Sequence, residues 1–134
     1  MLKLEDFFQR GLKSTLLFRN NGSFSHNGPW KSVEEETVVD RLYIGDFCSA
    51  EYTITVDLDG QNKEIIKCLL VSTLENASLV VYARTSTTTD LVNISARVND
   101  SFVELLLTPA IPRAVGAKFI YTAQLFQTQN PLQI

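Results

Sequence analysis

The stretch from Cys48 to Leu74 constrains the fold of this chain more than any other. Apolar and polar side chains alternate strictly over residues 48–58, and a second apolar run begins at Ile65. Such a period of two places alternate side chains on opposite faces of a strand. The pair Asp59-Gly60 separates the two runs. It is typical of a hairpin turn, because glycine tolerates a positive φ. We therefore predict a β-hairpin with one buried face.

Further strands are predicted at regular spacing along the chain. Apolar alternation recurs in segments 36–44, 77–85, 91–98, 101–108 and 117–127, and turn-forming or polar residues separate these segments. With a strand at 12–18 the total is about eight, as in a jelly roll. The predicted fold is an all-β, antiparallel, jelly-roll-like β-sandwich. The side chains expected in its core are Tyr52, Ile54, Val56, Leu70, Ile94, Val98, Leu105 and Phe119. In segment 36–44 the inward set is Val38, Leu42 and Ile44.

Residues 1–31 differ from the rest, and we predict two parts, an N-terminal arm or extension over 1–31 and a sandwich body over 32–134. Apolar residues from Leu4 to Leu12 recur at helical spacing, which predicts a short helix. Around His26 to Pro29 the sequence has turn chemistry. The large apolar side chains of this part are candidates for an interface between subunits, although the arm could equally complete its own domain. They are Leu4, Phe7, Phe8, Leu12, Leu17, Phe18 and Trp30.

Composition and charge set limits on the function. The chain has 134 residues, 45% of them hydrophobic, and a formal net charge of −3. A net acidic charge argues against a dedicated nucleic-acid partner. The charge is uneven, with about +3 in residues 1–31 and about −6 in the remainder. No apolar run approaches the length that spans a bilayer, and charged residues interrupt the N-terminus, so we expect no signal peptide and a protein made in a cytoplasm.

No cluster of side chains predicts a reaction, a cofactor or a metal site. The single histidine, His26, is expected in a loop facing water. Cys48 and Cys68 are expected to be reduced, because the hairpin register separates them. Four oxygen-bearing residues near the hairpin turn resemble half a calcium loop, but they lack its remaining ligands and its flanking helices. These residues are Asp57, Asp59, Asn62 and Glu64. Glu34, Glu35 and Glu36 are interpreted as a solvated entry to a strand.

The body resembles short virion proteins of tailed bacteriophages, especially phages that infect cyanobacteria. The resemblance covers about residues 36–132 and consists of strand and turn patterns without a catalytic motif. The segments that carry it are Tyr43-Ile44-Gly45-Asp46-Phe47, Ala50-Glu51-Tyr52-Thr53-Ile54, Lys63-Glu64-Ile65-Ile66, Val80-Val81-Tyr82-Ala83-Arg84-Thr85, Arg97-Val98-Asn99 and Gly116-Ala117-Lys118.

What this resemblance implies is a structural protein of a phage particle with no active site. The first expectation is a small decoration or cement protein on the head shell. The alternatives are a tail, collar or fibre component, or a carbohydrate-binding module for host attachment. Exposed aromatic side chains for sugar binding would be Trp30, Tyr43 and Tyr82. The implied partners are a major capsid protein or tail and neck proteins, together with further copies of the chain. No nucleic acid or membrane is expected, and the implied location is the virion.

Overall fold

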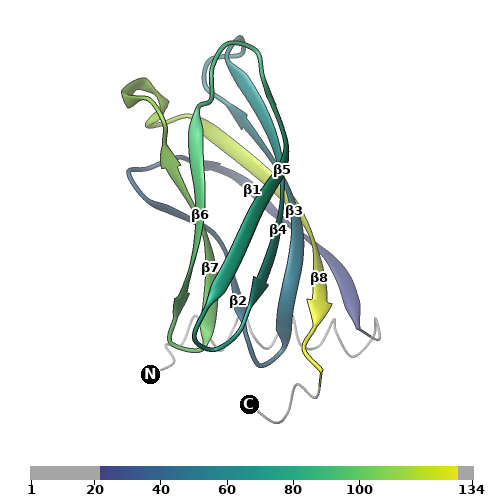
Figure 1. Cartoon of the computed structure of the whole chain (residues 1–134). Coiled ribbons are helices and arrows are strands. Elements are labelled where there is room, and N and C mark those ends of the chain that lie inside the picture. Colours follow the sequence, from purple (N-terminus) through teal and green to yellow (C-terminus); the bar gives the residue numbers. More distant parts are fainter. Residues whose placement is uncertain (1–21, 130–134) are drawn as a thin grey trace.

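The computed structural model of the protein describes residues 22–129 and shows two antiparallel β-sheets packed face to face (Figure 1). The large sheet has five strands in the order β1-β8-β3-β4-β5, and the small sheet has three in the order β2-β7-β6. The elements are β1 (Ser23–Ser32), β2 (Thr37–Tyr43), β3 (Phe47–Asp57), β4 (Lys63–Ser72), β5 (Ala77–Ser86), β6 (Val92–Asn99), β7 (Phe102–Pro109), the 3₁₀ turn η1 (Pro112–Ala114) and β8 (Lys118–Gln127). The predicted β-sandwich is confirmed, and the finer jelly-roll likeness stays a prediction.

The central hairpin is confirmed as β3 and β4. Tyr52 pairs with Cys68 in its register, so Cys48 and Cys68 lie at different levels of the ladder, as the sequence predicted. Gly60 has a φ of +82° in the turn. The Asp59 carboxylate closes the turn by accepting hydrogen bonds from the backbone N–H groups of Asn62 and Gln61, and these bonds lower the pKa of Asp59. The Asp57 carboxylate also accepts a hydrogen bond from the backbone N–H of Gly60. The turn is therefore organised by two aspartates and one glycine, all visible in the sequence.

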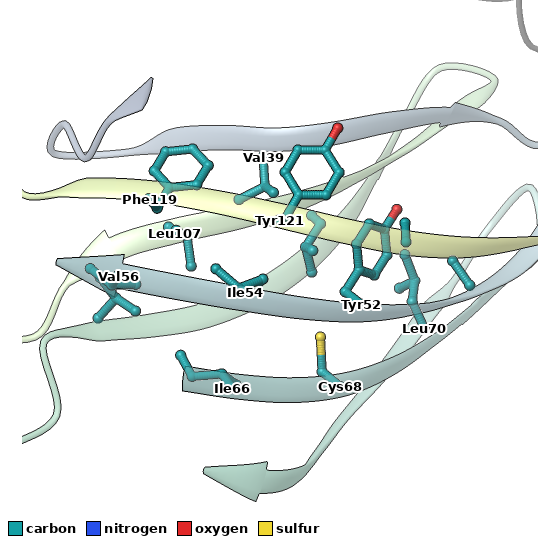
Figure 2. Close-up of a cluster of buried hydrophobic side chains, with 14 of the residues drawn as sticks. Val39, Tyr52, Ile54, Val56, Ile66, Cys68, Leu70, Leu107, Phe119 and Tyr121 are labelled. Atoms are coloured by element: carbon teal, nitrogen blue, oxygen red, sulfur yellow. The ribbon is translucent and has the colours of Figure 1, made fainter. Parts of the chain in front are cut away.

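The core lies between the two sheets and is built mainly by the inward faces of β2, β3, β4, β7 and β8 (Figure 2). Of the eight side chains expected in the core, six are buried, namely Tyr52, Ile54, Val56, Leu70, Leu105 and Phe119. Ile94 and Val98 are partly buried and pack against the core from β6. This strand is at the edge of the small sheet. Fully burying an aliphatic side chain contributes about 1.5–3 kcal/mol, so these faces hold the sheets together.

At two places the buried residue is the chain neighbour of the residue that the alternation predicts to be buried. Val39 and Asp40 are buried in β2, whereas Val38 is only partly buried, because the register shifts between Val38 and Asp40. A similar shift at the start of β3 buries Phe47 and leaves Cys48 half-buried. A bulge adds a residue to one strand and exchanges the faces on either side of it. Alternation alone does not show where such a residue is inserted.

The expected turn at residues 26–29 is wrong, because these residues belong to β1. This strand pairs with β8 at one edge of the large sheet, so residues 23–31 of the predicted extension lie in the sandwich. Pro29 is accommodated where the register shifts between Gly28 and Lys31. Gly28 is required by packing, since a Cβ there would come within 2.2 Å of the Tyr121 ring. The predicted helix over 4–12 and strand over 12–18 lie outside the described residues.

Candidate functional site

An exposed apolar strip lies on the outer face of the large sheet, the face turned away from the small sheet. It consists of Leu69, Val71, Val80, Tyr82 and Phe126, which are between 43% and 54% exposed. The ladders place them side by side: Leu69 is opposite Val80, while Val71 and Phe126 are both opposite Ser49. The strip therefore crosses from β8 to β5 as one continuous surface.

A depression of about 390 Å³ lies within this strip. Leu69, Val71, Val80 and Phe126 line it together with the small side chains of Ser49 and Ser78. At one end of the strip, the Tyr82 hydroxyl donates a hydrogen bond of 3.0 Å to Glu51 Oε1. Exposed apolar side chains that gather around a depression are typical of a surface that binds another molecule.

Sequence reasoning missed the strip, although the signal for it was present. Residues 65–71 are apolar on both faces, apart from Lys67. A strand with this pattern is expected to be covered on both sides. Here β4 buries Ile66, Cys68 and Leu70 and leaves Ile65, Leu69 and Val71 exposed. The second apolar face is the sequence feature that indicates a partner.

Trp30 is the one predicted interface residue that lies within the described range. Its side chain is 53% exposed on β1 and lines a depression of about 300 Å³ at the end of the large sheet, beside Asp57, Asp59 and Lys118. The other six predicted interface residues lie outside residues 22–129, namely Leu4, Phe7, Phe8, Leu12, Leu17 and Phe18. Their role as interface residues stays a prediction.

His26 does not face water from a loop, which corrects the prediction for this residue. It lies on β1, with Nε2 2.9 Å from the Tyr121 hydroxyl and 3.4 Å from Asp40 Oδ1. The Tyr52 hydroxyl donates a 2.9 Å hydrogen bond to Asp40 Oδ2. In Figure 2 the hydroxyls of Tyr52 and Tyr121 point the same way. The four side chains therefore form one polar cluster that joins the two sheets beside β1 and β2.

The chemistry of this cluster is structural. Burial raises the pKa of Tyr52 well above its usual value, and the negative charge of Asp40 raises it further. The pKa of Tyr121 is raised by the same two causes. Both hydroxyls are therefore protonated and act as hydrogen-bond donors at neutral pH. A nucleophilic site needs a hydroxyl or thiol activated by a base, and these tyrosines are held in the opposite state.

A second buried carboxylate, Glu64, joins the sheets beside β5 and β6. Its side chain is fully buried and accepts hydrogen bonds from Arg84 Nε at 2.7 Å and from the backbone N–H groups of Leu91 and Val92. Arg84 also donates to the backbone carbonyl of Val92. Hydrogen bonding to Glu64 raises the pKa of Arg84. Glu64 is thus not a metal ligand but an internal tie from β4 to the start of β6.

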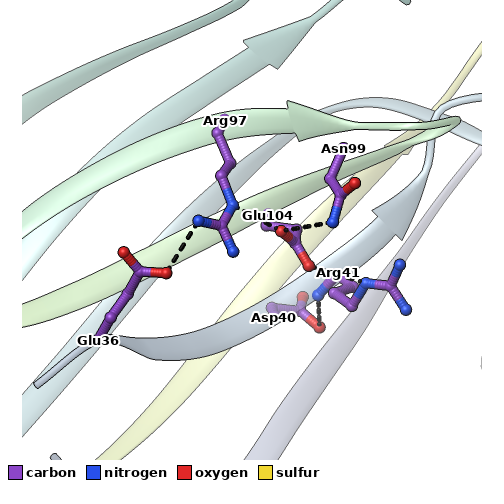
Figure 3. Close-up of polar contacts among 6 residues, drawn as sticks. All are labelled: Glu36, Asp40, Arg41, Arg97, Asn99 and Glu104. Carbon is purple, nitrogen blue, oxygen red and sulfur yellow. Dashed lines mark hydrogen bonds and ion pairs between the residues drawn. The ribbon is translucent and has the colours of Figure 1, made fainter. Parts of the chain in front are cut away.

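The outer face of the small sheet carries paired charges (Figure 3). Arg97 donates to Glu36 and to Glu104, each at 2.8 Å. Arg41 Nε lies 3.0 Å from the second oxygen of Glu104. Glu36 is therefore part of an ion-pair network. From the sequence, Glu36 was expected to be solvated, together with the two glutamates before it. The two outer faces differ in kind, because one carries matched charges and the other an apolar strip.

The described residues contain no metal site of the kind considered from the sequence. No group of three or more His, Cys, Asp or Glu side chains in residues 22–129 is placed to hold a metal ion. The half calcium loop is not assembled, since Glu64 turns into the sandwich while Asp59 caps the turn. In the same range there is no helix long and apolar enough to cross a membrane.

Comparisons with known proteins give a limited result. No protein-family model and no curated protein matches the chain. Among solved structures, the tailspike protein of Acinetobacter baumannii phage AM24 is similar with a TM-score of 0.49 and 9% identity, over 80% of this chain and 27% of the tailspike. A tailspike protein of Acinetobacter baumannii bacteriophage Fri1, described as a capsular polysaccharide depolymerase, is similar with a TM-score of 0.46 and 14% identity, over 84% of this chain and 21% of that one. Likeness at this level assigns neither family nor function.

Proposed function

We propose that this chain is a non-enzymatic structural component of a tailed-phage virion and that it binds another virion protein through the apolar strip. The observation that carries the proposal is the strip itself. It has five apolar side chains, each roughly half exposed, and four of them line a depression on a sheet face. Large apolar and aromatic side chains at the centre of a patch supply most of the binding energy in protein interfaces.

The composition of the same face supports this proposal. Beyond the strip, the outer face of β3 and β8 carries Thr53, Thr55, Thr122 and Gln124. An apolar centre with a polar rim is the arrangement of a protein–protein interface. The buried tyrosines and carboxylates serve as ties between the sheets, which supports a structural rather than a catalytic role. The virion assignment itself rests on the sequence resemblance of residues 36–132.

The position in the particle has two alternatives, the head shell and the tail. The sequence resemblance led first to a head decoration protein. The structural neighbours are named tailspike proteins, which agrees with the tail alternative. With TM-scores below 0.5 they do not decide between the two. Mass spectrometry of purified heads and tails, separated after disruption of the particle, would locate the protein directly.

The docking surface is tested by placing a charge in the strip. We expect Val71→Lys to fold normally and to be lost from assembled particles, because the side chain is 54% exposed and lies in the depression. Asn93→Lys is the matched control, since it adds the same charge at an exposed position on β6 of the small sheet, away from the strip and its rim. Incorporation is measured as the amount of each variant in purified particles, and thermal unfolding verifies the fold. Equal incorporation of both variants would refute the proposed surface.

A second candidate function, saccharide binding, is favoured by the depression at Trp30. An exposed indole beside the carboxylates of Asp57 and Asp59 offers an apolar face together with hydrogen-bond acceptors, as ligand sites do. Trp30 is the single tryptophan of the chain, so its fluorescence reports directly on this site. Titration with host capsular polysaccharide should shift the emission of the wild type and of Asp59→Ala to different extents. An unchanged emission spectrum would exclude this candidate.

A further inference from the structure

The edge of the large sheet formed by β5 has the features of a strand that accepts a partner. This strand is ten residues long and, among the described residues, forms a ladder with β4 alone. Residues 77–81, Ala-Ser-Leu-Val-Val, contain no charge, no glycine and no proline. A long apolar edge strand without such residues presents unpaired backbone groups to another strand.

The other edge of the same sheet is protected. Strand β1 contains Pro29, which has no N–H group, and Lys31, and its register shifts between Gly28 and Lys31. Proline, lysine and bulges are the devices by which natural sheets prevent edge-to-edge pairing. Because these devices are concentrated on β1, the composition of residues 77–81 is a specific property of one edge.

The regular part of β5 ends at Tyr82. The ladder shifts between Lys67 and Cys68 of β4, which leaves Tyr82 as the extra residue of β5. Beyond it, Arg84 is the single charged residue of the strand, and it turns toward Glu64. A pairing partner therefore meets an uninterrupted, uncharged ladder over residues 77–81.

We propose that residues 77–81 pair antiparallel with the same residues of a second copy, so that the two large sheets form one continuous sheet about a two-fold axis. With the axis at Leu79, Ser78 lies opposite the partner's Val80. Antiparallel pairing keeps the outer faces on the same side, so the apolar strips of the two copies become neighbours. The pairing uses the edge of the sheet, whereas the proposed virion docking uses its face, and the two are tested separately.

Three observations favour a second copy as the occupant. The segment carries no charge, so two copies do not repel each other. In this register Val80 and Val81, which are 53% and 37% exposed, lie opposite the partner's Ser78 and the partner's Ala77, so the pairing reduces their exposure. The contact is isologous, which is the commonest symmetry of homo-oligomers. A ladder of this length buries less than the roughly 800 Å² per partner of a standard interface, so we expect a weak dimer.

Sedimentation equilibrium of the full chain tests this proposal. Between about 10 μM and about 1 mM, the range in which weak complexes form, the average mass should rise from 15.0 kDa toward twice that value. Ser78→Lys should weaken the dimer at least about tenfold, because it places a charge at the paired edge. Asn27→Lys makes the matched change on exposed β1 and should leave the dimer unchanged. Val80→Lys is a second edge variant, and circular dichroism verifies each fold.

The outcomes separate this proposal from the proposed function. A monomer at every concentration would overturn the β5 pairing, as would a dimer that Ser78→Lys and Val80→Lys leave intact. The β5 pairing would also be overturned if Asn27→Lys weakened the dimer as much as Ser78→Lys does. Val71 lies on β4, opposite Ser78 and one strand inward from the paired edge, so Val71→Lys leaves the backbone groups of β5 free to pair. It should keep the wild-type dimer while losing particle incorporation. Loss of incorporation without any dimer would support the docking face alone.

Discussion

The two open sides of the sandwich, one beside β1 and β2 and the other beside β5 and β6, are tied in the same way inside and differ at their edges. Each side has one buried carboxylate that crosses between the sheets. Asp40 reaches from the small sheet to Tyr52, and Glu64 reaches from the large sheet to the backbone of Leu91 and Val92. Internal cohesion therefore does not distinguish the two sides.

The edges do distinguish them. On the first side, β1 has Pro29 and a register shift, and β2 has a second shift and the inward-facing Asp40. On the second side, residues 77–81 have none of these devices. Protection of one side and not of the other is what a chain needs to associate in a defined direction without aggregating. What marks the proposed side of association is therefore the absence of these devices from its edge strand, and not a difference in the internal ties.

The largest expected effect comes from removing the tie on the β5 side. Glu64→Ala should lower the free energy of unfolding by about 3 kcal/mol, because it leaves buried donors without an acceptor. The control is Glu36→Ala, which removes an ion pair with Arg97 between two side chains that are 54% and 44% exposed. Exposed pairs contribute about 0–1 kcal/mol. Urea unfolding of both variants measures the difference, and equal losses would contradict the role of Glu64.

On the β1 side, removing one hydrogen bond to the buried Asp40 should lower the free energy of unfolding by less than removing Glu64 does on the β5 side. Tyr52→Phe keeps the ring in the core and deletes the donor to Asp40. We expect a loss of about 1–2 kcal/mol, since the carboxylate keeps the backbone N–H of Arg41 at 3.1 Å. A change smaller than the error of urea unfolding would show that the hydroxyl does not stabilise this side.

Alkaline pH should lower stability by a smaller amount. Burial raises the pKa of Cys68 to about 11, and the pKa values of Tyr52 and Tyr121 are raised as well. The native state then holds these protons at pH values where the unfolded chain has lost them. The contribution of these three groups to the free energy of unfolding is therefore fully present below about pH 9. We expect the free energy of unfolding to fall by about 1 kcal/mol by pH 10.5. In urea titrations across this range, Tyr52→Phe should show a shallower decline above pH 10, and a profile that rises with pH would contradict the assignment.

The smallest expected change in stability concerns the residues that precede β1. Deleting residues 1–11 should leave a folded body and the β5 dimer, because the proposed pairing uses residues 77–81. The predicted interface role of Leu4, Phe7 and Phe8 would then appear as lost incorporation into the particle. Thermal unfolding, sedimentation and particle assays of the shortened chain measure the three properties. Loss of the dimer on this deletion would place the association in the arm.

The sequence predicted those parts of the fold that depend on local pattern. The hairpin of β3 and β4 followed from alternation and the Asp59-Gly60 pair, and the ladder has that register. The bulges did not follow, since one inserted residue leaves the apolar pattern of Val38 and Val39 almost unchanged. Bulges are set by how the paired strands fit and not by the residues of one strand.

The candidate site was less predictable, because it depends on contacts between distant residues. His26 and Tyr121 are 95 positions apart, and nothing near His26 in the sequence indicates its tyrosine partner. The strip was visible as a second apolar face of residues 65–71, but only the fold shows that nothing in the described chain covers it. The pattern identifies an unusual strand, and the topology shows which face is exposed.

Amide hydrogen exchange, compared between β5 and β1, tests the central claim most directly. Exchange is measured at about 10 μM and about 1 mM protein, so that the two samples differ only in the population of the dimer. The pairing predicts that amides of residues 77–81 exchange more slowly at the higher concentration, while those of β1 exchange at the same rate in both. Protection that increases on β1 instead, or on neither edge, would contradict the claim that β5 is the edge through which this protein associates.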